Sequence, residues 1–204
     1  MRIDSVSQSP DRAGRYLVKF SDGTSLRLYR QTVEDFRMYP GLEIEDLQAL
    51  RDHDSRYSAK MRAVRIISAS AVSRRDLETR LVRKGESEEQ ARAAVEWLED
   101  LNLVDDRQTA RQIVERCIHK GYGLQRAKQA LYEKQIPKDL WEEVLADYPD
   151  QMERIADFLR TKLRDPDDPK QVRRAIDAAL RRGHSYGQIK GALEQIGSEI
   201  EEEY

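Results

Sequence analysis

The fold is decided at residues 121–136, which read GYGLQRAKQALYEKQI and lie between two amphipathic helical patterns. Upstream, apolar residues recur at the spacing of one helix face, at Ala110, Ile113, Val114, Cys117 and Ile118. Gly121 can end that helix in a left-handed conformation. A second helix is predicted after Gly123, and Pro137 suits the first turn of a third. The three helices and their short turns predict one compact unit.

The same pattern occurs on both sides of this unit. A shift of 50 positions brings Val64 onto Val114, and a further shift of 62 brings Gly121 onto Gly183. Such self-similarity is typical of helical repeats, whose units bury their apolar faces against neighbours. We therefore expect a mostly α fold, an elongated array of three tandem three-helix repeats. Structural roles in the repeat turns are expected for Gly85, Gly121, Gly123 and Gly183.

The N-terminal residues have the pattern of a small β-sheet with short helices. Strands are expected at residues 2–7, 16–20 and 24–29, with a loop at residues 8–14. Asp22-Gly23 between the last two strands is typical of a hairpin turn. Because a sheet of this size is marginal alone, it should pack on a helix at residues 32–39 or 45–52. His53-Asp54-Ser55 is the expected joint to the helical repeats.

The chain therefore divides into four predicted parts, which are residues 1–55, 56–104, 105–149 and 150–204. The last part is the longest repeat, because a helix at residues 151–162 and a proline-containing loop at residues 165–169 precede its repeated pattern. Its third helix is expected to be the short acidic end at residues 198–204.

Composition favours a helical protein with thin cores over an enzyme with a deep pocket. Charged residues make up 36% of the chain, apolar residues 39% and aromatic residues 7%. No stretch approaches the apolar length of a membrane span, and residues 1–5 lack the apolar core of a signal peptide. Cys117 lies on an apolar stripe and is expected to be a buried, reduced thiol. These features predict a cytoplasmic protein.

The net charge of −2 conceals an alternation of sign along the chain. Residues 60–84 carry eight Lys/Arg and two Asp/Glu, whereas residues 85–106 carry one and eight. Residues 107–138 again carry eight and two, and residues 139–153 carry none and six. The charge therefore changes sign with the structural unit.

The basic residues of equivalent helices are the candidate binding residues. They are Arg74, Arg75, Arg80, Arg83, Lys84, Arg111, Arg116, Lys120, Arg126, Lys128 and Lys134, with Arg107 in the same cluster. In a stacked array, equivalent helices line one side, so these cations would form a stripe suited to phosphates or to an acidic protein surface. A single basic run is as well explained as a solubilising helix surface. Tyr122 is a further candidate, either to stack on a base or to fill a gap beside a helix end.

The motifs of common catalytic sites are missing from this sequence. His53, His119 and His184 are too scattered for metal-ligand spacing, and no second thiol accompanies Cys117. Gly121-Tyr122-Gly123 is not followed by the third glycine of a dinucleotide fingerprint. The carboxylates lie in helical runs that are typical of solvated faces. We therefore expect no catalysis, no metal and no cofactor.

The central stretch resembles the RecX family, bacterial modulators of the RecA recombinase. The matching residues are Asp106 and Ala110, then Lys120-Gly121-Tyr122-Gly123, Arg126, Leu131, Lys134 and Ile136. Thr109 stands where that family usually has an aromatic residue, and Gln135 where it usually has glycine. The resemblance covers about residues 56–196.

The resemblance implies a non-catalytic regulator of homologous recombination and DNA repair. Such a protein would bind the RecA filament, with single-stranded DNA inside it, as a monomer. It would most often inhibit RecA's ATPase, strand exchange and coprotease activities. Two alternatives stay open: a nucleic-acid-binding helical repeat protein that acts without RecA, and a helical scaffold that docks another protein through the N-terminal hairpin.

Overall fold

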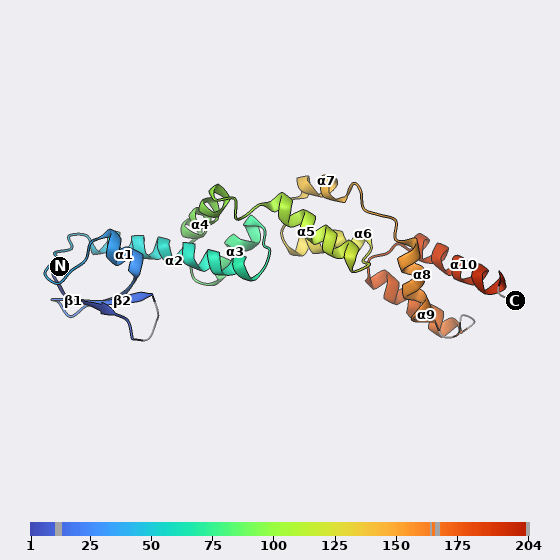
Figure 1. Ribbon diagram of the computed structural model, residues 1–204, viewed down its shortest axis with the longest axis horizontal. Coiled ribbons are helices and arrows are strands. Elements are labelled where there is room, and N and C mark those ends of the chain that lie inside the picture. Colours follow the sequence, from blue (N-terminus) through green and yellow to red (C-terminus); the bar gives the residue numbers. More distant parts are fainter. Residues whose placement is uncertain (11–13, 164, 166–167, 203–204) are drawn as a thin grey trace. The chain divides into compact units, whose positions relative to one another are not determined.

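The computed structural model describes residues 1–10, 14–163, 165 and 168–202, with only the backbone described for residues 198–202. The chain forms two compact units, Met1–Val104 and Asp105–Tyr204. In Figure 1 the first unit is coloured blue to green and the second yellow-green to red. The expectation of a mostly α fold that begins with a small sheet is confirmed.

The first unit begins with an antiparallel sheet of three strands in the order β1-β2-β3. The strands are β1 (Ile3–Gln8), β2 (Arg15–Phe20) and β3 (Ser25–Tyr29). The hairpin turns at Asp22-Gly23, where Gly23 has a φ of 85° and the Asp22 carboxylate accepts a 2.9 Å bond from the Thr24 N–H. Residues 11–13 of the predicted loop lie outside the described residues.

Two helices cover this sheet, α1 (Arg30–Asp35) and α2 (Leu47–Ala69). The predicted joint at residues 53–55 is wrong, because α2 runs through it without a break. No glycine or proline interrupts α2, and the Asp54 side chain forms tertiary bonds instead of ending the helix. Its carboxylate accepts bonds from the Tyr29 N–H (2.6 Å), the Thr32 hydroxyl (2.8 Å) and Arg15 (3.2 Å). These bonds attach the sheet to the helix.

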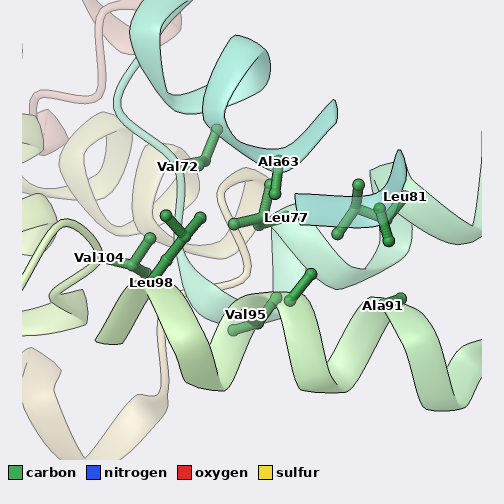
Figure 2. Packing of buried hydrophobic residues seen from close by; sticks show 10 residues of the cluster. Ala63, Val72, Leu77, Leu81, Ala91, Val95, Leu98 and Val104 are labelled. Atoms are coloured by element: carbon green, nitrogen blue, oxygen red, sulfur yellow. The ribbon is translucent and has the colours of Figure 1, made fainter. Parts of the chain in front are cut away.

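The C-terminal half of α2 packs with α3 (Arg74–Arg83) and α4 (Glu88–Asp100). Figure 2 shows Ala63 from α2, Leu77 and Leu81 from α3, and Val95 and Leu98 from α4 in one cluster. The serines before the two shorter helices cap them, with Ser73 Oγ accepting from the Asp76 N–H and Ser87 Oγ from the Gln90 N–H.

The second unit opens with α5 (Asp106–His119) and α6 (Leu124–Glu133). A 3₁₀ turn, η1 (Lys138–Leu140), then leads into a short helix, α7 (Trp141–Leu145). The cluster at their centre contains Ala110, Val114, Leu131 and Ile136. The Trp141 indole N–H donates a 3.1 Å bond to the Ile136 carbonyl, which joins α7 to the end of the preceding turn.

The last three helices are α8 (Met152–Arg160), α9 (Pro169–Arg181) and α10 (Tyr186–Glu202). The predicted separate helix at residues 198–204 is wrong for the described residues, because α10 continues unbroken to Glu202; residues 203–204 lie outside them. The third place in the group is taken by α8, whose Ile155, Ala156 and Leu159 are fully buried against α9 and α10. The third helix of this group is therefore α8, which comes before α9 and α10 in the sequence, and not a helix after them.

In the predicted loop at residues 165–169, residues 166–167 lie outside the described ones. Asp168 caps α9, whose first residue is Pro169. In the described part of the chain the buried apolar residues form four clusters, one under the sheet and one in each three-helix group. These clusters support our proposal of four parts. The boundaries near residues 104 and 149 lie between helices, whereas the one near residue 55 lies within α2.

Candidate functional site: basic surfaces of the two units

A basic pocket of about 500 Å³ lies in the first unit between the sheet, α2 and α3. Its lining comprises Arg15, Tyr29, Arg62, Arg65, Ile66, Ala69, Ser70, Arg80 and Lys84. Five of these nine side chains are cations, and they come from three separate elements. The pocket therefore concentrates positive charge in a hollow that no single helix could form.

Three of the five cations are held by carboxylates. Arg62 pairs with the buried Glu86 at 2.8 Å. It also donates to the carbonyl of Lys84, the residue that caps the C-terminus of α3. Arg80 makes two bonds of 2.8 Å to Asp76, one turn earlier on α3. The Arg15 guanidinium pairs with Asp54 and lies 3.3 Å from the centre of the Tyr29 ring. These contacts fix the paired arginines in position.

The other two cations have no such partner. Arg65 and Lys84 are exposed, and among the described residues no carboxylate lies within ion-pair distance of either. The positive charge of these two side chains is therefore available to a ligand.

Only part of the predicted basic run on α3 reaches this pocket. Arg80 and Lys84, one turn apart, line it, whereas Arg74, Arg75 and Arg83 do not. Arg74 instead pairs with Glu99 of α4 at 2.7 Å. The pocket residues that sequence reasoning missed are Arg15, Arg62 and Arg65. Arg62 and Arg65 were counted in the net positive charge of residues 60–84. No signal in the nearby sequence shows that Arg15, in strand β2, would lie close to α2.

The basic residues of the second unit are divided between ion pairs and solvent. Arg107 and Arg111 of α5 both pair with Glu143 of α7, at 3.3 and 2.8 Å, and Arg126 pairs with Glu133 at 3.1 Å. Arg116 and Lys120 are exposed, and Lys134 is partly buried. Lys128 lines a shallow pocket of about 370 Å³ with Leu124, Trp141, Glu142, Leu145 and Ala146. The charge alternation thus partly reflects ion pairs between helices of one repeat.

The Gly121–Gly123 turn packs against the turn between α9 and α10. The Gly123 N–H donates to the Arg182 carbonyl at 2.9 Å, and the Gln125 N–H donates to the Gly183 carbonyl at 3.2 Å. His184 Nε2 donates to the Gly121 carbonyl at 3.1 Å. Gly121 and Gly183 have positive φ angles of 65° and 87°, as does Gly85 in the first unit at 94°. The motif glycines therefore hold two repeats together.

Two tyrosines and a histidine beside these turns are enclosed by protein. The Tyr148 hydroxyl donates a 2.6 Å bond to the Tyr122 carbonyl, and burial raises the pKa of Tyr148 to about 12. The Tyr122 ring is partly buried, with the Arg182 guanidinium 5.6 Å from its centre. Burial lowers the pKa of His184 and raises that of the Cys117 thiol. These surroundings favour packing over base stacking for Tyr122.

Within the described ranges, no three His, Cys, Asp or Glu side chains gather closely enough to hold a metal ion. No described helix combines the length and the apolar character needed to cross a membrane.

Known proteins are similar to this chain in sequence and in fold. Residues 105–145, which contain α5 to α7, match the family model described as RecX, second three-helix domain. A regulatory protein RecX from Vibrio campbellii is 27% identical over 139 residues, which cover 67% of this chain and 90% of that protein. The regulatory protein RecX of Mycobacterium avium is 30% identical over 134 residues, covering 62% of this chain and 78% of the relative. The chain belongs to the RecX family.

A solved RecX structure extends the likeness to the fold. The crystal structure of regulatory protein RecX superposes with a TM-score of 0.64 at 19% identity, and the match covers 93% of this chain and 98% of the solved one. The RecX family model matches the part of the chain where the Lys120–Gly123 motif joins α5 to α6. The relatives are named regulatory proteins, and the chain is therefore a member of a regulatory family.

Proposed function

We propose that this protein is a non-catalytic regulator of homologous recombination and DNA repair that binds RecA filaments and inhibits their activities. Its membership of the RecX family carries the proposal, because the family resemblance implies modulation of RecA. The name "regulatory protein" given to the relatives supports a role without catalysis. Since RecA works in the bacterial cytoplasm, the proposal places the chain there, acting as a monomer.

The exposed cations of each unit support contact with a repeating anionic partner. Arg65, Lys84, Arg116 and Lys120 are exposed, and none has a described carboxylate within ion-pair distance. A RecA filament on single-stranded DNA repeats its surface, so two units on one chain can contact successive positions. Each contact can be weak while the whole is tight, because the second forms at high effective concentration. The remaining basic candidates stay proposals for RecA or DNA contact.

The test is RecA's DNA-stimulated ATPase activity, measured while this protein is titrated in below one molecule per RecA. We expect turnover and filament length to fall. Arg116→Gln with Lys120→Gln should weaken the inhibition, because both cations are exposed at the C-terminal end of α5, beside the Lys120–Gly123 motif. Lys170→Gln with Arg173→Gln on α9 is the matched control, with the same change of charge on exposed residues. Unchanged turnover and filament length with the native protein would contradict the proposal.

A second candidate function is sequence-independent nucleic-acid binding without RecA. The basic pocket of the first unit favours it, because converging cations are what a phosphate backbone requires. DNA binding without RecA, measured at two salt concentrations, separates the candidates when read beside the ATPase assay. Strong, salt-sensitive DNA binding with no effect on RecA would support this second function over the first.

A further inference from the structure

We propose that the basic pocket between the sheet, α2 and α3 binds a backbone phosphate of single-stranded nucleic acid. This inference rests on the proposed function only in taking DNA to be part of the filament surface that the chain meets. It assigns the contact to Arg62, Arg65, Arg80 and Lys84, of which the first two lie outside the basic runs selected from the sequence.

The charge of the pocket favours an anion. Of its five cations, three are balanced by Asp54, Asp76 and Glu86, which leaves the charges of Arg65 and Lys84 without a described counter-ion. Concave surroundings of low dielectric focus the field of such charges, so an anion in the hollow interacts more strongly than it would on a flat surface. A phosphodiester, which carries one negative charge and acceptor oxygens, matches this excess.

The paired arginines add positioned donors. A guanidinium carries five N–H donors, and the bonds of Arg80 to Asp76 use its Nε and Nη2 atoms, so further donors remain. Because Glu86 and the Lys84 carbonyl already hold Arg62, that side chain loses little rotamer freedom when an anion arrives. Arginine donors in fixed positions are well matched to phosphate geometry.

The apolar part of the lining favours a single strand over a duplex or an acidic helix. Ile66, Ala69 and Tyr29 make up the apolar and aromatic part of the lining, and the Tyr29 ring meets Tyr57 edge-on at 5.0 Å. Proteins that bind single strands combine a positive hollow with apolar and aromatic surfaces that receive sugars and bases. A flexible strand can turn one phosphate into a local hollow, whereas duplex phosphates stay on a rigid convex surface. The single-stranded ligand is therefore the one that fits.

The test uses the full-length chain and a fluorescent oligothymidine, with anisotropy measured across a salt series. Arg65→Gln with Lys84→Gln should weaken binding about tenfold at low salt and reduce the slope of log K against log salt by about 1, as expected when one or two phosphate contacts are lost. The matched control is Lys170→Gln with Arg173→Gln, which removes the same charge from exposed positions of α9 outside the pocket. An unchanged unfolding midpoint establishes that each variant is folded.

Parallel RecA ATPase measurements separate this inference from the proposed function. If the pocket variant loses DNA affinity while the native chain has no effect on RecA, the pocket stands and the RecA role fails. If the pocket and control variants bind DNA equally, or the native chain has no measurable affinity, the inference is overturned. Unchanged DNA binding with lost RecA inhibition would also overturn it, because the pocket would then receive acidic protein surface.

Discussion

At the scale of single residues, the family motif is explained by the close approach of two backbones. Gly123 precedes α6, and a Cβ built there would meet the Gly183 carbonyl oxygen at 2.1 Å and the His184 nitrogen at 2.5 Å. Both neighbours are main-chain atoms of the opposite turn and cannot rotate away as a flexible side chain could. Glycine is therefore required at this position by the contact between repeats.

Replacing Gly123 with alanine should destabilise the second unit by at least about 2 kcal/mol, because the new methyl group forces two backbones apart. Urea denaturation followed by circular dichroism measures the change. Gly187→Ala on α10 is the control, since a Cβ there meets nothing within 4 Å. It should be neutral or stabilising by up to about 1 kcal/mol, because alanine favours a helix. Equal losses in the two variants would contradict the contact described here.

Gln135 shows the opposite situation, a side chain where glycine would fit better. It has a φ of 54°, and the repeat shift aligns it with Gly85, whose φ is 94°. The left-handed conformation costs a non-glycine residue about 1 kcal/mol or more. The chain folds this way because the Ile136 N–H still reaches the Leu131 carbonyl at 3.0 Å and closes the end of α6.

Gln135→Gly should therefore stabilise the protein by about 0.5–1 kcal/mol after allowance for the greater freedom of glycine in the unfolded chain. The measurement is the free energy of unfolding in denaturant. Lys134→Gly, at an ordinary φ of −91°, provides the comparison and should destabilise. A loss of stability in the Gln135 variant would mean that side-chain contacts of Gln135 outweigh the backbone strain.

At the scale of elements, α2 and the start of α10 connect parts of the chain that the repeat pattern treats as separate. The long helix α2 contributes Leu50 to the cluster under the sheet, and Ala59 and Ala63 to the first three-helix cluster. In the second unit, the turn before α10 places His184 against the Gly121 carbonyl that follows α5. These contacts cross from one predicted part to the next, so packing, and not only the tight turns, connects the parts within each unit.

His184 should make the stability of the second unit depend on pH. Its pKa is lowered from 6.5, mainly by burial and also by the neighbouring Arg182, while the bond to the Gly121 carbonyl opposes the shift. The unfolded chain therefore binds a proton on His184 more readily than the folded chain does. The stability that neutral His184 contributes is fully present above pH 6.5, and it declines as the pH falls toward the lowered pKa. Its Nδ1 atom has no described acceptor for the added proton.

The check is the free energy of unfolding at several pH values from 7.5 to about 5, for the native chain and for His184→Gln. The glutamine amide can still donate to the Gly121 carbonyl but does not titrate in this range. The native chain should lose more stability on acidification than the variant does. Since His53 and His119 are present in both proteins, the difference between the two pH profiles reports on His184. Identical pH dependence would mean that His184 is not protonated differently on folding.

At the scale of the whole molecule, the chain consists of two compact units that meet in sequence at Val104 and Asp105. The first contains the sheet cluster and the first three-helix cluster, and the second contains the other two. Asp105 is part of the second unit, because its carboxylate caps α5 by accepting from the Arg107 and Gln108 N–H groups. The boundary therefore falls where one core has ended and the next helix begins.

Fragments 1–104 and 105–204 should each fold alone and unfold in a cooperative transition, because each keeps its own buried clusters. Circular dichroism of the separate fragments should sum to the spectrum of the intact chain. A cut after residue 70 is the control, since it separates Ala59 and Ala63 from Leu77 and Leu81. That cut should leave the N-terminal piece with the core under the sheet but without the core formed by α2, α3 and α4. A largely unfolded 1–104 fragment would contradict the division.

Much of this architecture could be predicted from local pattern. The hairpin at Asp22-Gly23, the serine caps at Ser73 and Ser87 and the helix that follows Gly123 all depend on residues within a few positions of one another. Turn chemistry, capping and helical periodicity act at that range, so a single sequence is enough to reveal them. The basic character of α3 and α5 was equally visible.

Only the tertiary structure decided which residues that are distant in the sequence come into contact. The carboxylate of Asp54 holds a strand 25 residues away, and α8 takes the place of a helix expected after α10. The partners of Arg62 and Arg74 lie more than 20 positions along the chain, and Arg65 and Lys84 meet in a pocket with no local signal. The helical patterns and the excess of Lys/Arg in residues 60–84 by themselves placed these cations on helices that follow one another in the sequence. Which of them are neutralised depends on distances set by core packing, because an ion pair requires contact within a few ångströms.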